Sequence, residues 1–209
     1  MDTINFRGWF CNTSYGRLTE EERYHNGMRL AQALYNYGWT EESIAGILGN
    51  VEPECGLSPA TIESNPFDPD YIPSNQEILD RTTYYGGLGF VQWTPGRTEL
   101  VQWAEDTNQM VWYDGLTQVK RFKWEYDTHH WPWWTWYVTV HSPPEDCAEF
   151  FCRRYCRPQD PDATVQNRRR EGLKWFDRIH DKLHRPVDWF VYTKQSREGK
   201  ELKPPCRRI

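Results

Sequence analysis

Long apolar runs and an excess of basic residues are both missing from this sequence. No stretch approaches the roughly 18 uninterrupted apolar residues of a transmembrane helix, so we expect no membrane insertion. The opening residues, MDTINFRGWFCNTSYGRL, lack a basic segment followed by an apolar run, so we expect no signal peptide. The net charge of −5 argues against a nucleic-acid partner. A protein, a polysaccharide or a small molecule remains as the partner.

The usual zinc-ligand spacing C-x2-C is also missing from the six cysteines. Cys152 and Cys156 are four residues apart in a helical segment, which would make at most half of a metal site. An even number of cysteines permits disulfides, but the chain is long and carries no secretory signal. We therefore expect no metal and no organic cofactor, and free thiols that are mostly buried.

What the sequence does contain is helical periodicity, with little that indicates strands. Thr19 and Thr40 are suitable N-caps, and Gly38 is a suitable end for the first helix. The expected inward positions of the last helix are Leu173, Phe176, Ile179 and Leu183. We predict a mainly α-helical domain over 1–185 with about six helices, namely 17–38, 41–51, one that begins near Pro95, 114–127, 144–158 and 162–183.

Two segments break this periodicity. Residues 56–86 are rich in proline and in turn-forming residues, which predicts a long loop of the kind that usually carries function. Residues 186–209 have no period and carry Trp189, Phe190 and Tyr192, so we expect an extension that docks on a protein partner.

Glu54 is the most informative acidic residue. It follows Ile47 by seven positions, so it continues the apolar face of the helix that Thr40 caps, next to Pro53. A carboxyl group packed against apolar side chains has a raised pKa and can act as the general acid that protonates a glycosidic oxygen. The alternative is a carboxylate that caps a helix end or forms a salt bridge there.

Two stretches then resemble the phage tail lysozyme family when taken together. They are ILGNVEPECGLSP, which contains Glu54, and GLGFVQWTPGRTELVQWA, which contains Gln92 and Trp93. The segment from Gln118 to Glu125 and the closing FFCRRYCRPQD…NRRREGLKWF are weaker matches in the same order, over roughly 25–182. The sequence departs from the family pattern with Cys55 in place of serine, with Ser58 in place of asparagine, and with Pro53 before the acid.

The resemblance implies a lysozyme-like helical fold and a muramidase-type hydrolase of the phage tail. Glu54 would be the acid, and Gly89, Gln92 and Trp93 would form the other wall of the sugar groove. Glu63 is the preferred source of a second carboxylate on the loop, ahead of Asp68 and Asp70, whereas a lytic transglycosylase would need none. The implied partners are bacterial peptidoglycan and other virion proteins. The protein would be assembled in the host cytoplasm and would open the cell wall for genome delivery.

Other interpretations stay open. Cys55 with one of the histidines could form a cysteine peptidase site, although no histidine lies in a recognisable partner motif. The aromatic segment 123–138 either fills the core or forms a surface for glycan or protein, and the arginines 168–170 are expected to face solvent. The whole fold could also serve as a catalytically faded structural or glycan-binding module of the tail tip.

Overall fold

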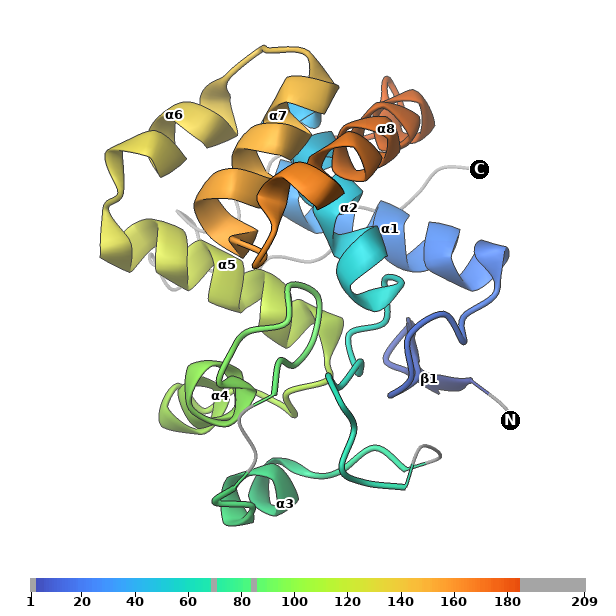
Figure 1. Cartoon of the computed structure of the whole chain (residues 1–209), viewed down its shortest axis with the longest axis vertical. Coiled ribbons are helices and arrows are strands. Elements are labelled where there is room, and N and C mark those ends of the chain that lie inside the picture. The colour runs from blue at the N-terminus through green and yellow to red at the C-terminus, as the bar shows by residue number, and fades with distance from the viewer. Residues whose placement is uncertain (1–2, 69–70, 84–85, 185–209) are drawn as a thin grey trace, which may run out of the picture.

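A computed structural model describes residues 3–68, 71–83 and 86–184, and the extension 186–209 lies outside this range. The described part is mainly α-helical, as predicted, and its only named strands form one short hairpin. Figure 1 shows most helices gathered in an upper lobe, with α3, α4 and loops in a lower lobe and α5 between the two. No helix within this range is long and apolar enough to cross a membrane.

The hairpin at the N-terminus was not predicted. Strands β1 (Ile4–Phe6) and β2 (Trp9–Cys11) pair antiparallel, and Phe6 lies opposite Trp9. The turn residues Arg7 and Gly8 both have positive φ, as the commonest two-residue hairpin turn requires. Strands of three residues are too short to show an alternating pattern in the sequence.

Helices α1 (Glu20–Tyr35) and α2 (Glu41–Cys55) begin where their predicted caps place them. Thr19 forms a capping box with Glu22, and the Thr40 side chain accepts a hydrogen bond from the backbone N–H of Ser43. Helix α2 is the centre of the upper lobe, because every residue from 43 to 51 is buried. It packs against α1, α7 (Pro144–Phe151) and α8 (Pro161–Ile179).

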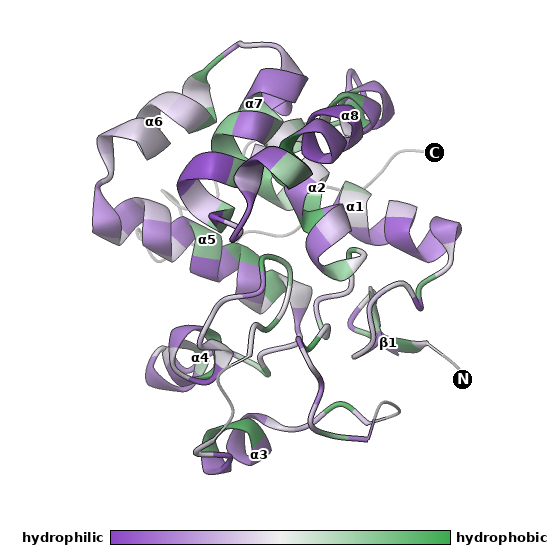
Figure 2. Ribbon diagram, viewed as in Figure 1, coloured by the Kyte–Doolittle hydropathy of each residue, from purple (hydrophilic) through white to green (hydrophobic). Residues whose placement is uncertain are grey.

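Close packing in this lobe depends on glycine. A Cβ atom on Gly49 would lie 2.5 Å from the backbone nitrogen of Gly172, so α2 and α8 touch backbone to backbone at this point. In Figure 2 the hydrophobic residues of α2 and α7 are turned toward this contact, and the outer side of α8 is hydrophilic. The last helix thus lies directly on the helix that carries Glu54.

The inward positions predicted for the last helix were correct for Ile179 and Leu183, which are buried, but wrong for Leu173. Leu173 is 45% exposed, whereas the buried positions of the helix are Val165, Arg168, Gly172, Trp175 and Ile179. Arg168 therefore does not face solvent, which corrects the expectation for the first of the three arginines. Arg170 is exposed as expected, and Arg169 is half-buried.

The predicted loop contains a helix that the sequence analysis missed. Helix α3 (Asn75–Asp80) begins with a capping box between Ser74 and Glu77. The segment after Pro95 forms a π-helical turn, η1 (Arg97–Val101), that continues into α4 (Gln102–Asp106). Helix α5 (Gly115–His129) begins after Asp114, as predicted. Helix α6 (Pro132–Thr139) was not predicted, and η2 (Cys152–Cys156) is a second π-helical turn that continues α7.

Candidate active site

The end of α2 presents Glu54 at the surface of the upper lobe. The helix includes Pro53 and closes at Gly56, whose φ of 59° is the left-handed conformation in which glycine is favoured. Cys55 is buried behind Glu54 and hydrogen-bonds to the carbonyl oxygen of Val51. The chain end thus turns Cys55 into the core and leaves Glu54 partly accessible.

Glu54 has a basic partner rather than an apolar wall. The Nη2 of Arg168 lies 2.6 Å from Oε1 of Glu54, and the Glu54 side chain is 23% exposed. The same guanidinium donates to the carbonyl oxygen of Asn50, one turn earlier in α2. Within the described residues, Oε2 of Glu54 accepts no hydrogen bond. Helix α8 therefore fixes the carboxylate by one oxygen and leaves the other oxygen available.

Glu52 lies in a different environment from Glu54. It accepts a hydrogen bond of 2.7 Å from the indole Nε1 of Trp175, and Arg23 lies 3.5 Å from its other oxygen. The two glutamates thus face different surroundings on either side of Pro53. Both oxygens of Glu52 are engaged by the protein.

The segment 87–94, which was predicted to form the other wall of the groove, lies in the lower lobe. Leu88 bridges to both Ile62 and Trp93, which joins this segment to the loop that follows α2. The buried side chain of Gln118 in α5 connects both pieces: its Oε1 accepts from the N–H of Phe90, and its Nε2 donates to the carbonyl oxygen of Pro59. One glutamine thus ties the two loops to the same helix.

Glu125 lies in α5 two turns after Gln118, and its carboxylate holds Trp93 in place. Its carboxylate accepts hydrogen bonds from the indole of Trp93 at 2.9 Å, from Arg121 at 2.7 Å and from the hydroxyl of Tyr155 at 2.5 Å. Burial and the Glu125 carboxylate raise the pKa of Tyr155 well above its ordinary value, so Tyr155 stays protonated and donates. Trp93 is therefore fixed in orientation, and it is 7% exposed.

A groove of about 590 Å³ lies beside Trp93 and Glu125, and we call it the Trp93 groove. Gln92, Trp93, Glu125 and Tyr155 line it, together with Cys156. The charges of Glu54 and Arg168 both act on the pKa of Cys156, so the ion pair lies close to this end of the groove. A second depression of about 330 Å³ is lined by Glu52, Pro53 and Gly56, among others. Glu54 lines neither of these two cavities itself, although its neighbour Pro53 lines the second one.

The predicted site residues separate into two groups. Gln92 and Trp93 line the Trp93 groove, and Nε2 of Gln92 donates to the carbonyl oxygen of Gly89. Gly89 is buried beneath Gln118, and Glu63 is an exposed residue that pairs with Gly87 through backbone and side chain. Contact of Gly89 and Glu63 with a substrate stays a prediction.

The other candidates for a second carboxylate on the loop were Asp68 and Asp70, and such a role for either stays a prediction. Asp68 is exposed, and Asp70 lies outside the described residues. Within the described ranges no group of three or more His, Cys, Asp or Glu side chains is placed to hold a metal ion.

The structure bears differently on two alternative interpretations, the cysteine peptidase site and the aromatic surface. Cys55 is fully buried, and burial raises the pKa of its thiol, so a nucleophilic thiolate is disfavoured there. The aromatic segment 123–138 is mixed: Trp134 and Tyr137 belong to the core, whereas Trp136 is 49% exposed. Trp131 lies between these extremes, stacks on His129 with centroids 4.6 Å apart, and lines the Trp93 groove.

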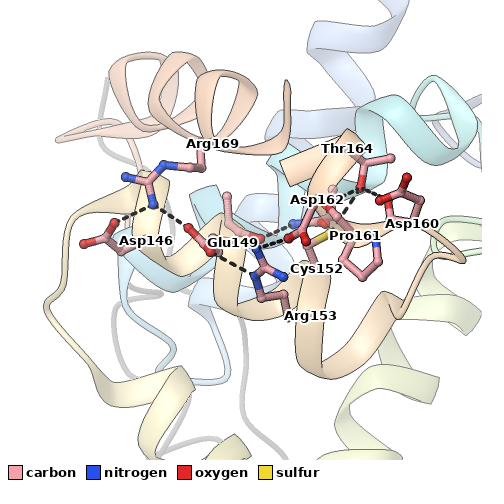
Figure 3. Close-up of polar contacts among 11 residues, drawn as sticks. Asp146, Glu149, Cys152, Arg153, Asp160, Pro161, Asp162, Thr164 and Arg169 are labelled. Carbon is pink, nitrogen blue, oxygen red and sulfur yellow. Dashed lines mark hydrogen bonds and ion pairs between the residues drawn. The ribbon is translucent and has the colours of Figure 1, made fainter. Parts of the chain in front are cut away.

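The outer face of α7 and α8 carries a separate network of ion pairs (Figure 3). Arg169 contacts Asp146 and Glu149, and Arg153 contacts Glu149 and Asp162. These bonds lower the pKa of Glu149. The network holds η2 to the start of α8 and takes no part in either cavity next to Glu54.

The role of Arg168 was missed from the sequence, and a signal for it exists. Arg168, Gly172, Trp175 and Ile179 follow one another by four, three and four positions, which is one face of a helix. An arginine on a buried face needs an acceptor, and Glu54 is that acceptor.

Comparison with known proteins covers this whole region. The sequence model of the phage tail lysozyme family matches residues 25–179, from within α1 to the last residue of α8. The protein named Morphogenesis protein 1 of Bacillus phage B103 is 28% identical over 163 residues, which are 73% of this chain and 40% of that protein. The chain thus spans less than half the length of this relative.

Proposed function

The chain belongs to the phage tail lysozyme family, and on this premise we propose that it is a peptidoglycan glycosidase carried in the virion. It cleaves the glycan strand between N-acetylmuramic acid and N-acetylglucosamine, with Glu54 as the acid. The observation that carries the proposal is the partly exposed carboxylate at the end of α2, which Arg168 binds through one oxygen while the other accepts no hydrogen bond from the described residues.

Cleavage of the glycosidic bond requires a proton donor next to the glycosidic oxygen. Glu54 protonates the glycosidic oxygen while the bond from that oxygen to the anomeric carbon breaks. The anomeric carbon then bonds to the oxygen of water in a hydrolase, or to the 6-hydroxyl oxygen of the same muramic acid in a transglycosylase. The attacking oxygen gives up its proton to a carboxylate, which is Glu54 itself in the transglycosylase. Arg168 is a positioning residue, because it holds the carboxyl group by Oε1 and directs Oε2 toward the strand.

The Trp93 groove supplies the binding surface on one side of the cleaved bond. Trp93 has its indole N–H committed to Glu125, so its ring edge packs against a sugar without competing for hydrogen bonds. Nε2 of Gln92 is engaged by Gly89, which leaves the amide oxygen to accept from a sugar hydroxyl or acetamido group. Glu63 stays our candidate for a second carboxylate in the hydrolase version.

The test compares the wild type with Glu54→Gln on purified peptidoglycan and weighs the soluble products by mass spectrometry. Reducing-end muropeptides from the wild type alone support a muramidase-type hydrolase, and anhydro-muropeptides support a transglycosylase. The matched control is Glu52→Gln, which removes the neighbouring carboxylate while keeping an acceptor for Trp175. Equal release by all three proteins would contradict the assignment of Glu54.

One observation favours a second candidate, a catalytically faded glycan-binding or structural protein of the tail tip. The pairing of Glu54 with Arg168, whose side chain is 6% exposed, is also the arrangement of a purely structural ion pair. In that case the wild type and Glu54→Gln both bind peptidoglycan in a sedimentation assay, and neither releases soluble fragments.

A further inference from the structure

Two arginines at the rim of the Trp93 groove have no carboxylate partner among the residues that the structure describes. They are Arg154 in η2 and Arg157 immediately after it, and both are exposed and line the groove. Arg157 donates from Nε to the carbonyl oxygen of Arg154, which leaves its terminal nitrogens available. The neighbouring Arg153 differs, because Glu149 and Asp162 both bind it.

The acids of the same groove are already engaged. Glu99 and Glu125 both contact Arg121, at 2.9 and 2.7 Å, and Glu125 also binds Trp93 and Tyr155. Arg121 is therefore shared between two carboxylates, whereas Arg154 and Arg157 contact no carboxylate of the described residues, and these three arginines and two glutamates carry a formal net charge of +1. Arginine presents paired N–H groups that match a carboxylate, so the rim is suited to an anionic ligand.

Unusual backbone conformations gather around this groove. Glu99 belongs to the π-helical turn η1, and Tyr155 and Cys156 belong to the π-helical turn η2. Gln92 and Arg157 have φ of 52° and 48°, which are left-handed conformations that non-glycine residues rarely adopt. Such π-turns and strained residues concentrate at functional sites, so the groove combines several independent marks of one.

We propose that the Trp93 groove binds the stem peptide of peptidoglycan, with Arg154 and Arg157 on its carboxylates. The proposal rests on the proposed function, because it adds a peptide subsite next to the bond that Glu54 cleaves. The glycan strand itself is neutral where the lactyl group of muramic acid is amidated, so it offers no partner for two arginines. The stem peptide carries free carboxylates, and the stacked pair of His129 and Trp131 supplies an apolar side for its alkyl groups.

The test measures binding separately from cleavage. Titration calorimetry with a soluble, sugar-free stem tetrapeptide is carried out on Glu54→Gln, the double variant Arg154→Gln/Arg157→Gln in that background, and the control Arg153→Gln in the same background. We expect the double variant to weaken the Kd at least tenfold and the control to leave it unchanged. Binding should also weaken as the salt concentration is raised. A peptide with amidated carboxyl groups should bind Glu54→Gln no more tightly than the unmodified peptide binds the double variant.

Cleavage by the enzyme with Glu54 intact gives the second readout. Arg154→Gln/Arg157→Gln should lower kcat/KM on intact peptidoglycan at least tenfold and leave it unchanged on peptidoglycan whose peptide carboxyl groups have been converted to amides. Loss of activity on both substrates would overturn the peptide subsite while leaving the glycosidase standing. No cleavage by the wild type, with peptide binding intact, would instead overturn the glycosidase and keep the binding site.

Two further outcomes would also overturn the peptide subsite. One is equal peptide affinity in all three variants. The other is binding of a phosphate-bearing wall polymer, but not of the peptide, that depends on Arg154 and Arg157.

Discussion

At the scale of single residues, the two glutamates on either side of Pro53 show how placement separates roles. Glu52 uses both oxygens, one on Trp175 and one near Arg23, and this binds the end of α2 to α8 and α1. Glu54 uses one oxygen on Arg168 and keeps the other. The same side chain is thus a structural tie at one position and our candidate acid two residues later.

Arg168→Gln tests whether the ion pair positions Glu54. The buried guanidinium serves both Glu54 and the carbonyl oxygen of Asn50. Losing such charged hydrogen bonds should lower the free energy of unfolding by about 1–3 kcal/mol. We also expect muropeptide release to fall by about tenfold or more at an unchanged KM, because the carboxyl group loses its fixed orientation.

Arg170→Gln is the matched control, since this side chain is 72% exposed and should change stability by less than about 0.5 kcal/mol. Urea unfolding and initial rates of muropeptide release measure both effects. If Arg168→Gln and Arg170→Gln behave alike, the pair has no positioning role.

The sequence predicted Glu54 as an acid on the apolar face of its helix, but it did not predict the Arg168 partner, for a physical reason. The spacing of apolar residues identifies the buried face of a helix only when that face consists of apolar residues. The buried face of α8 also includes an arginine and a glycine. Selecting the apolar residues therefore placed Leu173 inward, where the structure has it 45% exposed. Trp93 was selected from the sequence and does line a groove, whereas its bond to Glu125 depends on α5, which is distant in the sequence.

At the scale of elements, predictability follows how local the signal is. Thr19 and Thr40 fix the starts of α1 and α2 through bonds within one turn, so both helices were predicted well. Helix α3 has an equally local signal in Ser74 and Glu77, but the surrounding prolines hid it. The π-helical turns had no signal that we recognised, and they continue into or from an ordinary helix.

The clamp between α5 and the 87–94 segment gives a prediction at this scale. Gly89→Ala places a Cβ 2.5 Å from Oε1 of Gln118 at a φ of 75°, so it adds a clash to backbone strain. Gly38→Ala has the same kind of strain at a φ of 85° with no atom within 4 Å. The strain alone should cost about 1–2 kcal/mol, and the clash should cost about 1–3 kcal/mol more.

Urea unfolding of both variants separates the two contributions. Gly89→Ala should also weaken glycan cleavage, because Gln118 holds Phe90 and therefore the backbone that carries Gln92 and Trp93. Equal losses of stability in Gly89→Ala and Gly38→Ala would show that Gln118 yields to the added methyl group without cost.

At the scale of the whole molecule, the core of the described residues includes cysteine thiols that burial keeps protonated. The five cysteines in these residues are unpaired, and four of them are buried. Burial raises the pKa of Cys11 and of Cys147 from 9.0 to about 12 in each case. Because of these raised pKa values, the free energy of unfolding of the domain varies with pH in the alkaline range.

The sign of that dependence follows from proton binding. Between about pH 9 and 12 the unfolded chain has lost the protons that Cys11 and Cys147 still hold when folded, so the free energy of unfolding falls as the pH rises. Each thiol contributes a slope of about 1.4 kcal/mol per pH unit. Urea unfolding at intervals from pH 8 to 10.5 measures the decline. Cys147→Ala should be less stable at pH 8 but should decline less steeply, and parallel slopes in the two proteins would contradict the role of this thiol.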